Sequence, residues 1–223
     1  MILGLVCARA GSKGILHKNM LELGGNSLLE IAIAKTVRAT EECVVSTDIN
    51  PVAFDIRTAR LRKRPKHLSG GRVSKWQVWR DALRWHDKNA TSRADAIVDV
   101  DVSRPLTRVE DVKAVIEAHR ANRGPVTLAV CEASKHPSFD IYRPSKWWGL
   151  RPCEGKGNIV ARQQLEPVYN YGGICVVSRK ALKESAGWFA AGVGYHMIPR
   201  SRSFDIDDEL DWQIVQDQWE RQP

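Results

Sequence analysis

The sequence predicts an α/β protein of three layers, α/β/α, in which helices cover both faces of a mostly parallel sheet. Two observations support this prediction. Apolar runs alternate with amphipathic segments along most of the chain, and the first run, at residues 2–7, is almost continuously apolar. A continuous apolar run is typical of a strand buried on both faces, and strand–helix alternation favours parallel strands joined by helical crossovers.

The N-terminal half contains the clearest helix signals. Ser27 precedes an amphipathic stripe and is a suitable N-cap. Trp76 and Trp79 recur at helical spacing, which is more typical of a buried helix face than of a ligand platform. The predicted elements of this half are a strand at 2–7, a glycine-containing loop to Asn19, a helix from 28, a strand at 43–47, a helix across 52–61 and a helix at 74–86.

The C-terminal half repeats the alternation but contains one interruption. Residues from about 136 to 164 hold short extended pieces, several Pro and Gly and the pair Trp147-Trp148, with no helix signal. We interpret this segment as a β-rich arm inserted into a single domain that spans residues 1–223. The other predicted elements are strands at 94–100, 125–131, 173–177 and about 195–198, and helices at 109–121, after Ser178 and at about 208–219.

Composition limits the class of protein. A chain of 223 residues suits one well-buried core, and no apolar run reaches the length of a membrane span. Arg9 ends the first apolar run too early for a signal peptide, so we expect a cytoplasmic protein that does not bind membranes. The five cysteines lack CxxC spacing and are expected to be buried thiols. The net charge of +8 indicates anionic partners without identifying them.

A basic, glycine-containing loop directly follows the first strand. It reads A-R-A-G-S-K-G and then K-N, from Ala8 to Asn19. Ligands of parallel α/β sheets bind at the carboxyl ends of strands, and glycines let backbone amides point at an anion. The loop also carries three cationic side chains, which suit a triphosphate. Its spacing is neither that of a Walker A loop nor that of G-x-G-x-x-G. The candidate nucleotide-binding residues of this loop are Ala8, Arg9, Gly11, Ser12, Lys13, Lys18 and Asn19.

Two acidic motifs accompany this loop. Asp205 and Asp207 form a D-x-D whose carboxylates share one side if the segment is extended, and Mg²⁺ commonly binds one or two carboxylates plus phosphate oxygens. The same segment would also serve as the acidic first turn of the last helix. Asp101 follows the third strand, where it would bind a metal or a substrate hydroxyl, or cap the turn.

The order of these motifs resembles the CMP-sugar synthetases, the acylneuraminate cytidylyltransferase family, which is related to the CMP-Kdo synthetases. The resemblance extends over nearly the whole chain. It is carried by A-R-x-G-S-K-G-x-x-x-K-N at 8–19, V-S-T-D at 45–48, Arg64-Pro65 with Ser74, Pro105-Leu106, R-Q-Q-L at 162–165, G-G-I at 172–174 and F-D-I-D with E-L-D at 204–211.

The resemblance implies a Rossmann-like nucleotidyltransferase sheet and a magnesium-dependent cytidylyltransferase. CTP phosphates would bind Arg9, Ser12, Lys13 and Lys18, and cytosine would lie near Arg64 and Ser74. Mg²⁺ would bind Asp205 and Asp207. An acceptor hydroxyl of a sialic-acid-like sugar would attack the α-phosphorus and release pyrophosphate, with Arg9, Lys13, Lys18 and Asp207 as the catalytic residues. The inserted arm resembles the dimerisation element of the family, which implies a homodimer or a dimer of dimers; Trp147 and Trp148 would lie in that interface or in the core.

The acceptor side departs from the family pattern. Where the family has a glutamine, a serine and an asparagine, this chain has Asp101, Arg104 and Tyr171. An extra carboxylate would repel an acidic sugar unless it binds a metal or an amine. The candidate acceptor-binding residues are therefore Asp101, Arg104, Tyr171 and Arg162, the last as a partner for the acceptor carboxylate.

The sequence leaves two alternatives open, a different acceptor and a different class of protein. The same chemistry could act on a phosphonate. A different class, a non-catalytic basic nucleic-acid-binding protein, would leave the basic loop and the D-I-D unexplained, and the chain lacks a pattern of interleaved aromatic and basic residues for it.

Overall fold

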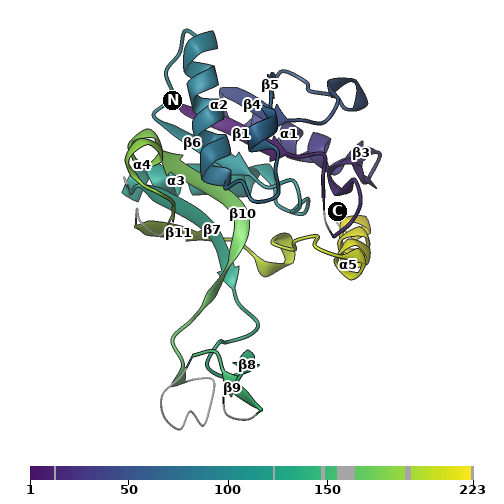
Figure 1. Ribbon diagram of the computed structural model, residues 1–223, viewed down its shortest axis with the longest axis vertical. Coiled ribbons are helices and arrows are strands. Elements are labelled where there is room, and N and C mark those ends of the chain that lie inside the picture. The colour runs from purple at the N-terminus through teal and green to yellow at the C-terminus, as the bar shows by residue number, and fades with distance from the viewer. Residues whose placement is uncertain (13, 123, 147–148, 155–163, 189–191, 222–223) are drawn as a thin grey trace.

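The computed structural model describes residues 1–12, 14–122, 124–146, 149–154, 164–188 and 192–221 (Figure 1). A seven-stranded sheet has the order β11-β7-β10-β6-β1-β4-β5. Only β10 runs antiparallel to its neighbours within this sheet of described residues. This confirms the predicted α/β class with a mostly parallel sheet. Its strands are β1 (Ile2–Ala8), β4 (Glu42–Thr47), β5 (Arg60–Lys63), β6 (Ala96–Val100), β7 (Val126–Glu132), β10 (Tyr169–Ser178) and β11 (Val193–Met197).

Helices pack on both faces of the sheet because alternate strand residues point in opposite directions. Leu3 and Leu5 of β1 pack with α2 and α4, whereas Val6 packs with α1 and α5. On that second face α3 lies beside α1 and covers β6. The helices are α1 (Leu28–Ala39), α2 (Lys75–Asn89), α3 (Val109–Asn122), α4 (Arg179–Glu184) and α5 (Glu209–Glu220).

The helix starts follow from their capping residues. Ser27 caps α1 in a reciprocal box with Glu30, and Ser74 caps α2 by accepting from the amide of Gln77. Trp76 and Trp79 are buried against the sheet, in agreement with the core role expected for the Trp stripe. All five cysteines are free thiols.

The prediction of a helix across residues 52–61 is wrong. The segment has a 3-10 turn at Pro51–Ala53 and then forms the edge strand β5. Leu61 pairs with Val45 and Arg62 with Ser46 in a parallel ladder. Hydrogen bonds to β4 thus outweigh the local helical preference, a tertiary effect that periodicity does not report. Within the described residues, other 3-10 turns lie at Lys18–Met20, Lys66–Leu68 and Arg200–Arg202.

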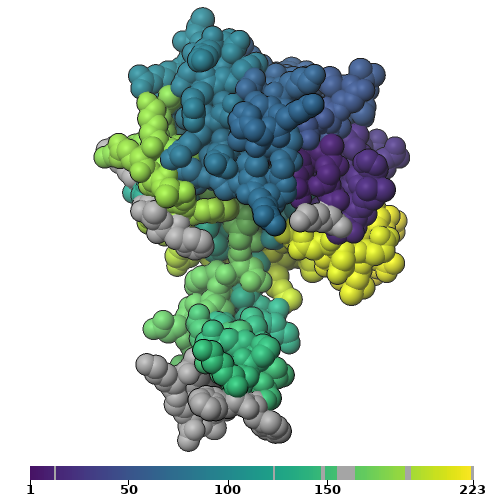
Figure 2. Space-filling view, viewed as in Figure 1, coloured from purple at the N-terminus to yellow at the C-terminus, as the bar shows by residue number. Residues whose placement is uncertain are grey.

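The inserted segment forms an arm that projects from the body beyond β7 and β10 (Figures 1 and 2). Its described part contains an antiparallel hairpin of β8 (Tyr142–Pro144) and β9 (Leu150–Pro152). A second small hairpin, β2 (Glu22–Leu23) and β3 (Asn26–Ser27), precedes α1. Trp147 and Trp148 lie outside the described residues. Across the described ranges, no helix combines the length and apolarity that a bilayer crossing requires.

Candidate active site

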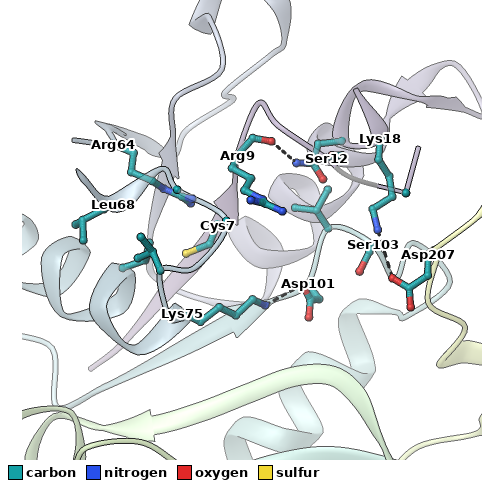
Figure 3. A pocket seen from close by; sticks show the side chains of 17 residues that line it. Cys7, Arg9, Ser12, Lys18, Arg64, Leu68, Lys75, Asp101, Ser103 and Asp207 are labelled. Atoms are coloured by element: carbon teal, nitrogen blue, oxygen red, sulfur yellow. Dashed lines mark hydrogen bonds and ion pairs between the residues drawn. The ribbon is translucent and has the colours of Figure 1, made fainter. Parts of the chain in front are cut away.

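A cavity of about 410 Å³ opens where β1, β4 and β6 end (Figure 3). This is the edge at which parallel α/β sheets bind ligands. Its walls come from the basic loop, from the segment between β5 and α2, from the turn after β6 and from the D-I-D segment. The lining residues are Cys7, Arg9, Ser12, Gly14, Lys18, Asn19, Arg64, Leu68, Gly70, Gly71, Val73, Lys75, Val78, Asp101, Val102, Ser103 and Asp207.

The basic loop is held by hydrogen bonds at both of its ends. Asp48, which follows β4, accepts a 2.8 Å hydrogen bond from the amide of Ala10. The Asn19 side-chain amide donates to the carbonyl oxygen of Arg9 at 2.9 Å. The V-S-T-D segment therefore supports the loop that carries Arg9 and Ser12 into the cavity.

The loop lies directly against the D-I-D segment, almost two hundred residues away in sequence. The Lys18 ammonium lies 3.7 Å from an Asp207 carboxylate oxygen and donates a hydrogen bond to the carbonyl oxygen of Ile206. A Cβ on Gly14 would lie 2.0 Å from the carbonyl oxygen of Asp207, so only glycine permits this contact. Figure 2 shows the N-terminal loop beside the C-terminal region.

The structure brings most of the predicted nucleotide residues together, but not all of them. Arg9, Ser12, Lys18, Asn19 and Arg64 line the cavity. Ala8 is buried at the end of β1, and Gly11 is exposed and does not line the cavity. Ser74 caps α2, while its neighbours Val73 and Lys75 face the cavity. Lys13 lies outside the described residues.

Arg64 is buried in the cavity wall rather than extended into solvent. Its guanidinium donates to the Ser46 carbonyl oxygen at 2.6 Å and to the Ser46 hydroxyl at 3.3 Å. Its backbone amide continues the β4 ladder by donating to Thr47 at 2.8 Å. β4 therefore fixes the position of Arg64, and the apolar side chains of Leu68, Val73 and Val78 line the same end of the cavity.

Sequence reasoning missed Lys75 and Asp99. The Lys75 ammonium lies 2.8 Å from Asp101 and 3.0 Å from Asp99. Asp99 is fully buried in β6, close to the Cys7 thiol. The signal was available, because D-V-D at 99–101 places two carboxylates on one face of a strand. The lysine that pairs with these two carboxylates could not be inferred from the motif, because Lys75 belongs to a different element, α2.

The one cysteine among the lining residues, Cys7, is not poised as a nucleophile. Burial raises the pKa of the Cys7 thiol well above its usual value, and the neighbouring carboxylate of Asp99 adds to this effect. A protonated thiol is a poor nucleophile at neutral pH. The cavity is thus better suited to positioning and charge neutralisation than to covalent catalysis.

A second cavity of about 380 Å³ adjoins the first, and Asp207 lines both. Arg104 and Tyr171 lie here, whereas Asp101 faces the first cavity. Arg162 lies outside the described residues. The lining residues of the second cavity are Arg104, Cys131, Ser134, Asn170, Tyr171, Arg200, Ser203, Phe204, Asp205, Asp207 and Asp211.

Two departures from the family pattern, Arg104 and Tyr171, contact each other. The Arg104 guanidinium lies 5.6 Å from the centroid of the Tyr171 ring and pairs with Asp205 at 2.8 Å. It also donates to the carbonyl oxygen of Ser203. A Cβ on Gly173 would lie 2.2 Å from the Arg104 side chain, so this glycine, the fifth residue of β10, leaves room for the arginine. Burial raises the pKa of Tyr171 well above its usual value, so the phenol remains protonated.

The two aspartates of the D-I-D fit a magnesium ion that is held largely by substrate oxygens. Asp207 is exposed, and its side chain faces both cavities. One oxygen of Asp205 pairs with Arg104, and the other is buried and has no hydrogen-bond partner among the described residues. The described ranges contain no cluster of three or more potential metal-ligating side chains. This donor set suits Mg²⁺, which commonly takes one or two carboxylates and completes its shell with phosphate and water.

Comparisons with known proteins agree with this geometry. A sequence profile of the family described as "Cytidylyltransferase" matches residues 3–140, more than half of the chain. The chain is 28% identical to post-translational flagellin modification protein B of Campylobacter coli and 29% identical to CMP-N,N'-diacetyllegionaminic acid synthase of Campylobacter jejuni. Each alignment covers 96% of this chain and 93% of the relative.

Solved structures show the same fold at low sequence identity. A CMP:2-keto-3-deoxy-manno-octonic acid synthetase in complex with CTP superposes with a TM-score of 0.65 at 13% identity, covering 97% of this chain and 98% of the other. A 4-diphosphocytidyl-2C-methyl-D-erythritol synthase superposes with a TM-score of 0.66 at 15% identity and covers 97% of each chain. Fold, motif order and family profile coincide, and the chain belongs to the cytidylyltransferase family of nucleotidyltransferases.

Proposed function

We propose that this chain transfers CMP from CTP to a hydroxyl group of a sialic-acid-like nonulosonic or ulosonic acid, with Mg²⁺, and releases pyrophosphate. The observation that carries the proposal is that Arg9 and Lys18 line the first cavity together with Asp207, which pairs with Lys18 and also lines the second cavity. One cavity suits the nucleotide and the other the acceptor. The names of the relatives, which include CMP-N,N'-diacetyllegionaminic acid synthase and N-acylneuraminate cytidylyltransferase, support this substrate class.

The nucleotide would lie across the first cavity from Arg64 to Lys18. Its base suits the end with Arg64 and Leu68, and its phosphates suit the basic loop, from which Arg9 and Ser12 line the cavity. Lys13 of the same loop is proposed as a further phosphate ligand. The loop is fixed before the substrate arrives, so its charges need little reorganisation during the transfer. Phosphoryl-type transfer depends mainly on such positioning and charge neutralisation.

Asp205 and Asp207 would hold the magnesium ion. When bound, Mg²⁺ supplies charge neutralisation for phosphate oxygens. Asp207 is a suitable ligand because it lies at the junction of the two cavities, where the α-phosphoryl group must meet the acceptor. The hydrogen bond from Lys18 to the carbonyl oxygen of Ile206 would hold the neighbouring Asp207 in a fixed position relative to the basic loop.

The acceptor side can accommodate an acid despite its extra carboxylate. Asp101 is paired with the Lys75 ammonium, which it shares with Asp99, so an amine compensates part of its charge. Arg104 lines the second cavity with a guanidinium group that matches a carboxylate, and Tyr171 lines it as well. Arg200 lines the same cavity and is exposed. These two arginines face three aspartates, Asp205, Asp207 and Asp211, so an acidic acceptor would bind here together with the Mg²⁺ that Asp205 and Asp207 would hold. Arg162 of the R-Q-Q-L segment is proposed as a further partner for the acceptor carboxylate.

Two measurements test this function together. Because a ligand that binds only the folded state raises stability, CTP with Mg²⁺ at about 100 times its Kd should raise the Tm by about 5–10 °C. ATP, GTP and UTP should give much smaller shifts. Pyrophosphate release should then depend on a nonulosonic or ulosonic acid. Turnover with a phosphonate but with no sugar acid would show that the acceptor class is wrong, and equal stabilisation by all four triphosphates would contradict CTP as the donor.

We also propose that the chain forms a homodimer through the arm and the sheet edge at β11. Val193, Tyr195 and Met197 alternate along this edge strand with exposed side chains, and Tyr195 stacks on Tyr169 at 5.3 Å. The arm exposes Leu150 among other apolar side chains. An exposed edge strand and a cluster of exposed apolar side chains favour association with a second copy.

A further inference from the structure

Lys75 lies in the nucleotide cavity at a place that the loop residues do not reach. It is the first residue of α2, directly after the N-cap Ser74. Figure 3 shows its side chain extending along the cavity floor toward Asp101, between the end with Arg64 and Leu68 and the end with Lys18 and Asp207. A nucleotide that spans these two ends must pass over Lys75.

Two carboxylates fix the direction of the Lys75 ammonium. Asp99 and Asp101 are two apart in sequence at the end of β6 and point to the face that α2 covers. They lie 3.0 Å and 2.8 Å from the Lys75 nitrogen. Asp99 is fully buried, so its position is set by the sheet. The ammonium is thereby held in place before any ligand binds.

One donor of this ammonium remains for a ligand. A lysine ammonium has three hydrogens, and two of them are directed to Asp99 and Asp101. The side chain is 34% exposed, and Lys75 lines the cavity. Within the described part of the chain, the third hydrogen has no protein acceptor.

The charge on Lys75 is retained throughout the pH range of an ordinary enzyme. Burial alone would lower the pKa of Lys75, but the carboxylates of Asp101 and Asp99 outweigh burial and hold it well above its usual value. The three groups together carry one net negative charge. Among the described lining residues, Arg9 and Lys18 lie on the loop side of the cavity and the Arg64 guanidinium is directed to Ser46, so Lys75 is the cation that lies between the two ends.

We propose that Lys75 is a catalytic residue whose third hydrogen is donated to a non-bridging oxygen of the α-phosphoryl group of the nucleotide. This role rests on the proposed function, because it requires a cytidine nucleotide in the first cavity. The α-phosphoryl group is the part of the nucleotide between base and terminal phosphates, and it is the group that is transferred. A fixed cation at this place neutralises its charge without reorganisation during attack.

The test compares nucleotides that keep or lack the α-phosphate. Lys75→Met alone leaves two uncompensated carboxylates, so the decisive variant is Lys75→Met with Asp99→Asn, which leaves one negative charge, as in the wild type. Calorimetric titration should show CTP and CMP binding weakened by about 10-fold to 100-fold, the factor for one charge-assisted hydrogen bond. Cytidine binding, followed by NMR titration, should stay within about twofold of wild type. Lys88→Met, an exposed lysine of the same helix, is the matched control and should bind all three ligands as wild type does.

Two outcomes would overturn the role of Lys75. If the double variant binds CMP as tightly as wild type, Lys75 only compensates the carboxylates. If cytidine binding is weakened as much as CMP binding, the change has distorted the nucleoside end, and no α-phosphate contact exists. Both outcomes differ from a failure of the proposed function, in which wild-type protein would not prefer CTP to other triphosphates.

Discussion

Gly14 is the residue at which the basic loop and the D-I-D segment come closest. Because a Cβ there would lie 2.0 Å from the Asp207 carbonyl oxygen, Gly14→Ala must move one backbone away from the other. Misplacing catalytic groups by about 1 Å can cost about 100-fold in rate, so we expect kcat/KM to fall by this order. Gly187→Ala is the control, since among the described residues, apart from its chain neighbours, no atom lies within 4 Å of its added Cβ. Unchanged kcat/KM for Gly14→Ala would show that the loop contact does not position Asp207.

Lys35 supports the turn that presents Arg104, and it makes folding stability depend on pH. Its ammonium donates to the carbonyl oxygen of Pro105 at 3.0 Å and to the Thr107 hydroxyl at 2.9 Å. Burial lowers its pKa from 10.5 to about 7, although Asp111 acts in the opposite direction. Between these values the unfolded chain binds more protons, so the contribution of Lys35 to the free energy of unfolding increases as pH rises from about 7.

Lys35→Met isolates this contribution because it keeps the aliphatic stem and removes the titrating group. Denaturant unfolding of both proteins at several pH values from 7 to 9 should show the wild type gaining up to about 1.4 kcal/mol per pH unit relative to the variant. Parallel curves would mean that Lys35 keeps its ordinary pKa in the folded protein.

The sequence did not single out Lys35 or Lys75, whereas Arg9, Lys18 and Asp207 stand in short motifs. The partners of the two lysines lie on other elements, and sequence spacing does not reveal them.

Among the elements, α5 links helix stability to the site. The Asp211 carboxylate accepts from the amides of Asp207 and Asp208 at 2.9 Å and 3.2 Å, and Asp208 caps the helix in return. Asp211→Ala should therefore lower the free energy of unfolding by about 1 kcal/mol and also reduce kcat/KM, because the backbone of Asp207 loses its anchor. Ser27→Ala is the control, since it disrupts the capping box of α1, which lies away from both cavities. If Ser27→Ala and Asp211→Ala reduce kcat/KM equally for the same loss in free energy of unfolding, the capping of α5 has no specific effect on the active site.

The elements also show where sequence patterns suffice. Helix α1 was predicted from a capping serine before a clear apolar stripe, and helix α2 from Trp76 and Trp79 at helical spacing. The structure contains both helices, with Ser27 and Ser74 as their N-caps. The failure at residues 52–61 has a different cause. That segment lies at the sheet edge, where pairing of β5 with β4 decides the conformation, and neither partner carries a local signal for the other. Local sequence patterns thus predict helices α1 and α2, whereas they do not predict β5, whose conformation depends on pairing with β4.

At the scale of the whole molecule, the arm and the β11 edge predict a two-fold dimer that can be dissociated by single charges. Tyr195 is 53% exposed on the edge strand, and Leu150 is 69% exposed on the arm. In a two-fold interface each substitution is present twice, once in each copy. Burial of an unpaired carboxylate at about 1.4 kcal/mol per copy therefore raises the dissociation constant of the dimer about 100-fold. We expect sedimentation equilibrium to show a dimer for the wild type and monomers for Tyr195→Glu and Leu150→Glu. Val52→Glu, at a 90% exposed position in the segment that leads to the opposite sheet edge, should remain dimeric. A monomeric wild type, or dimers that withstand both arm and edge substitutions, would show that these surfaces do not pair two copies.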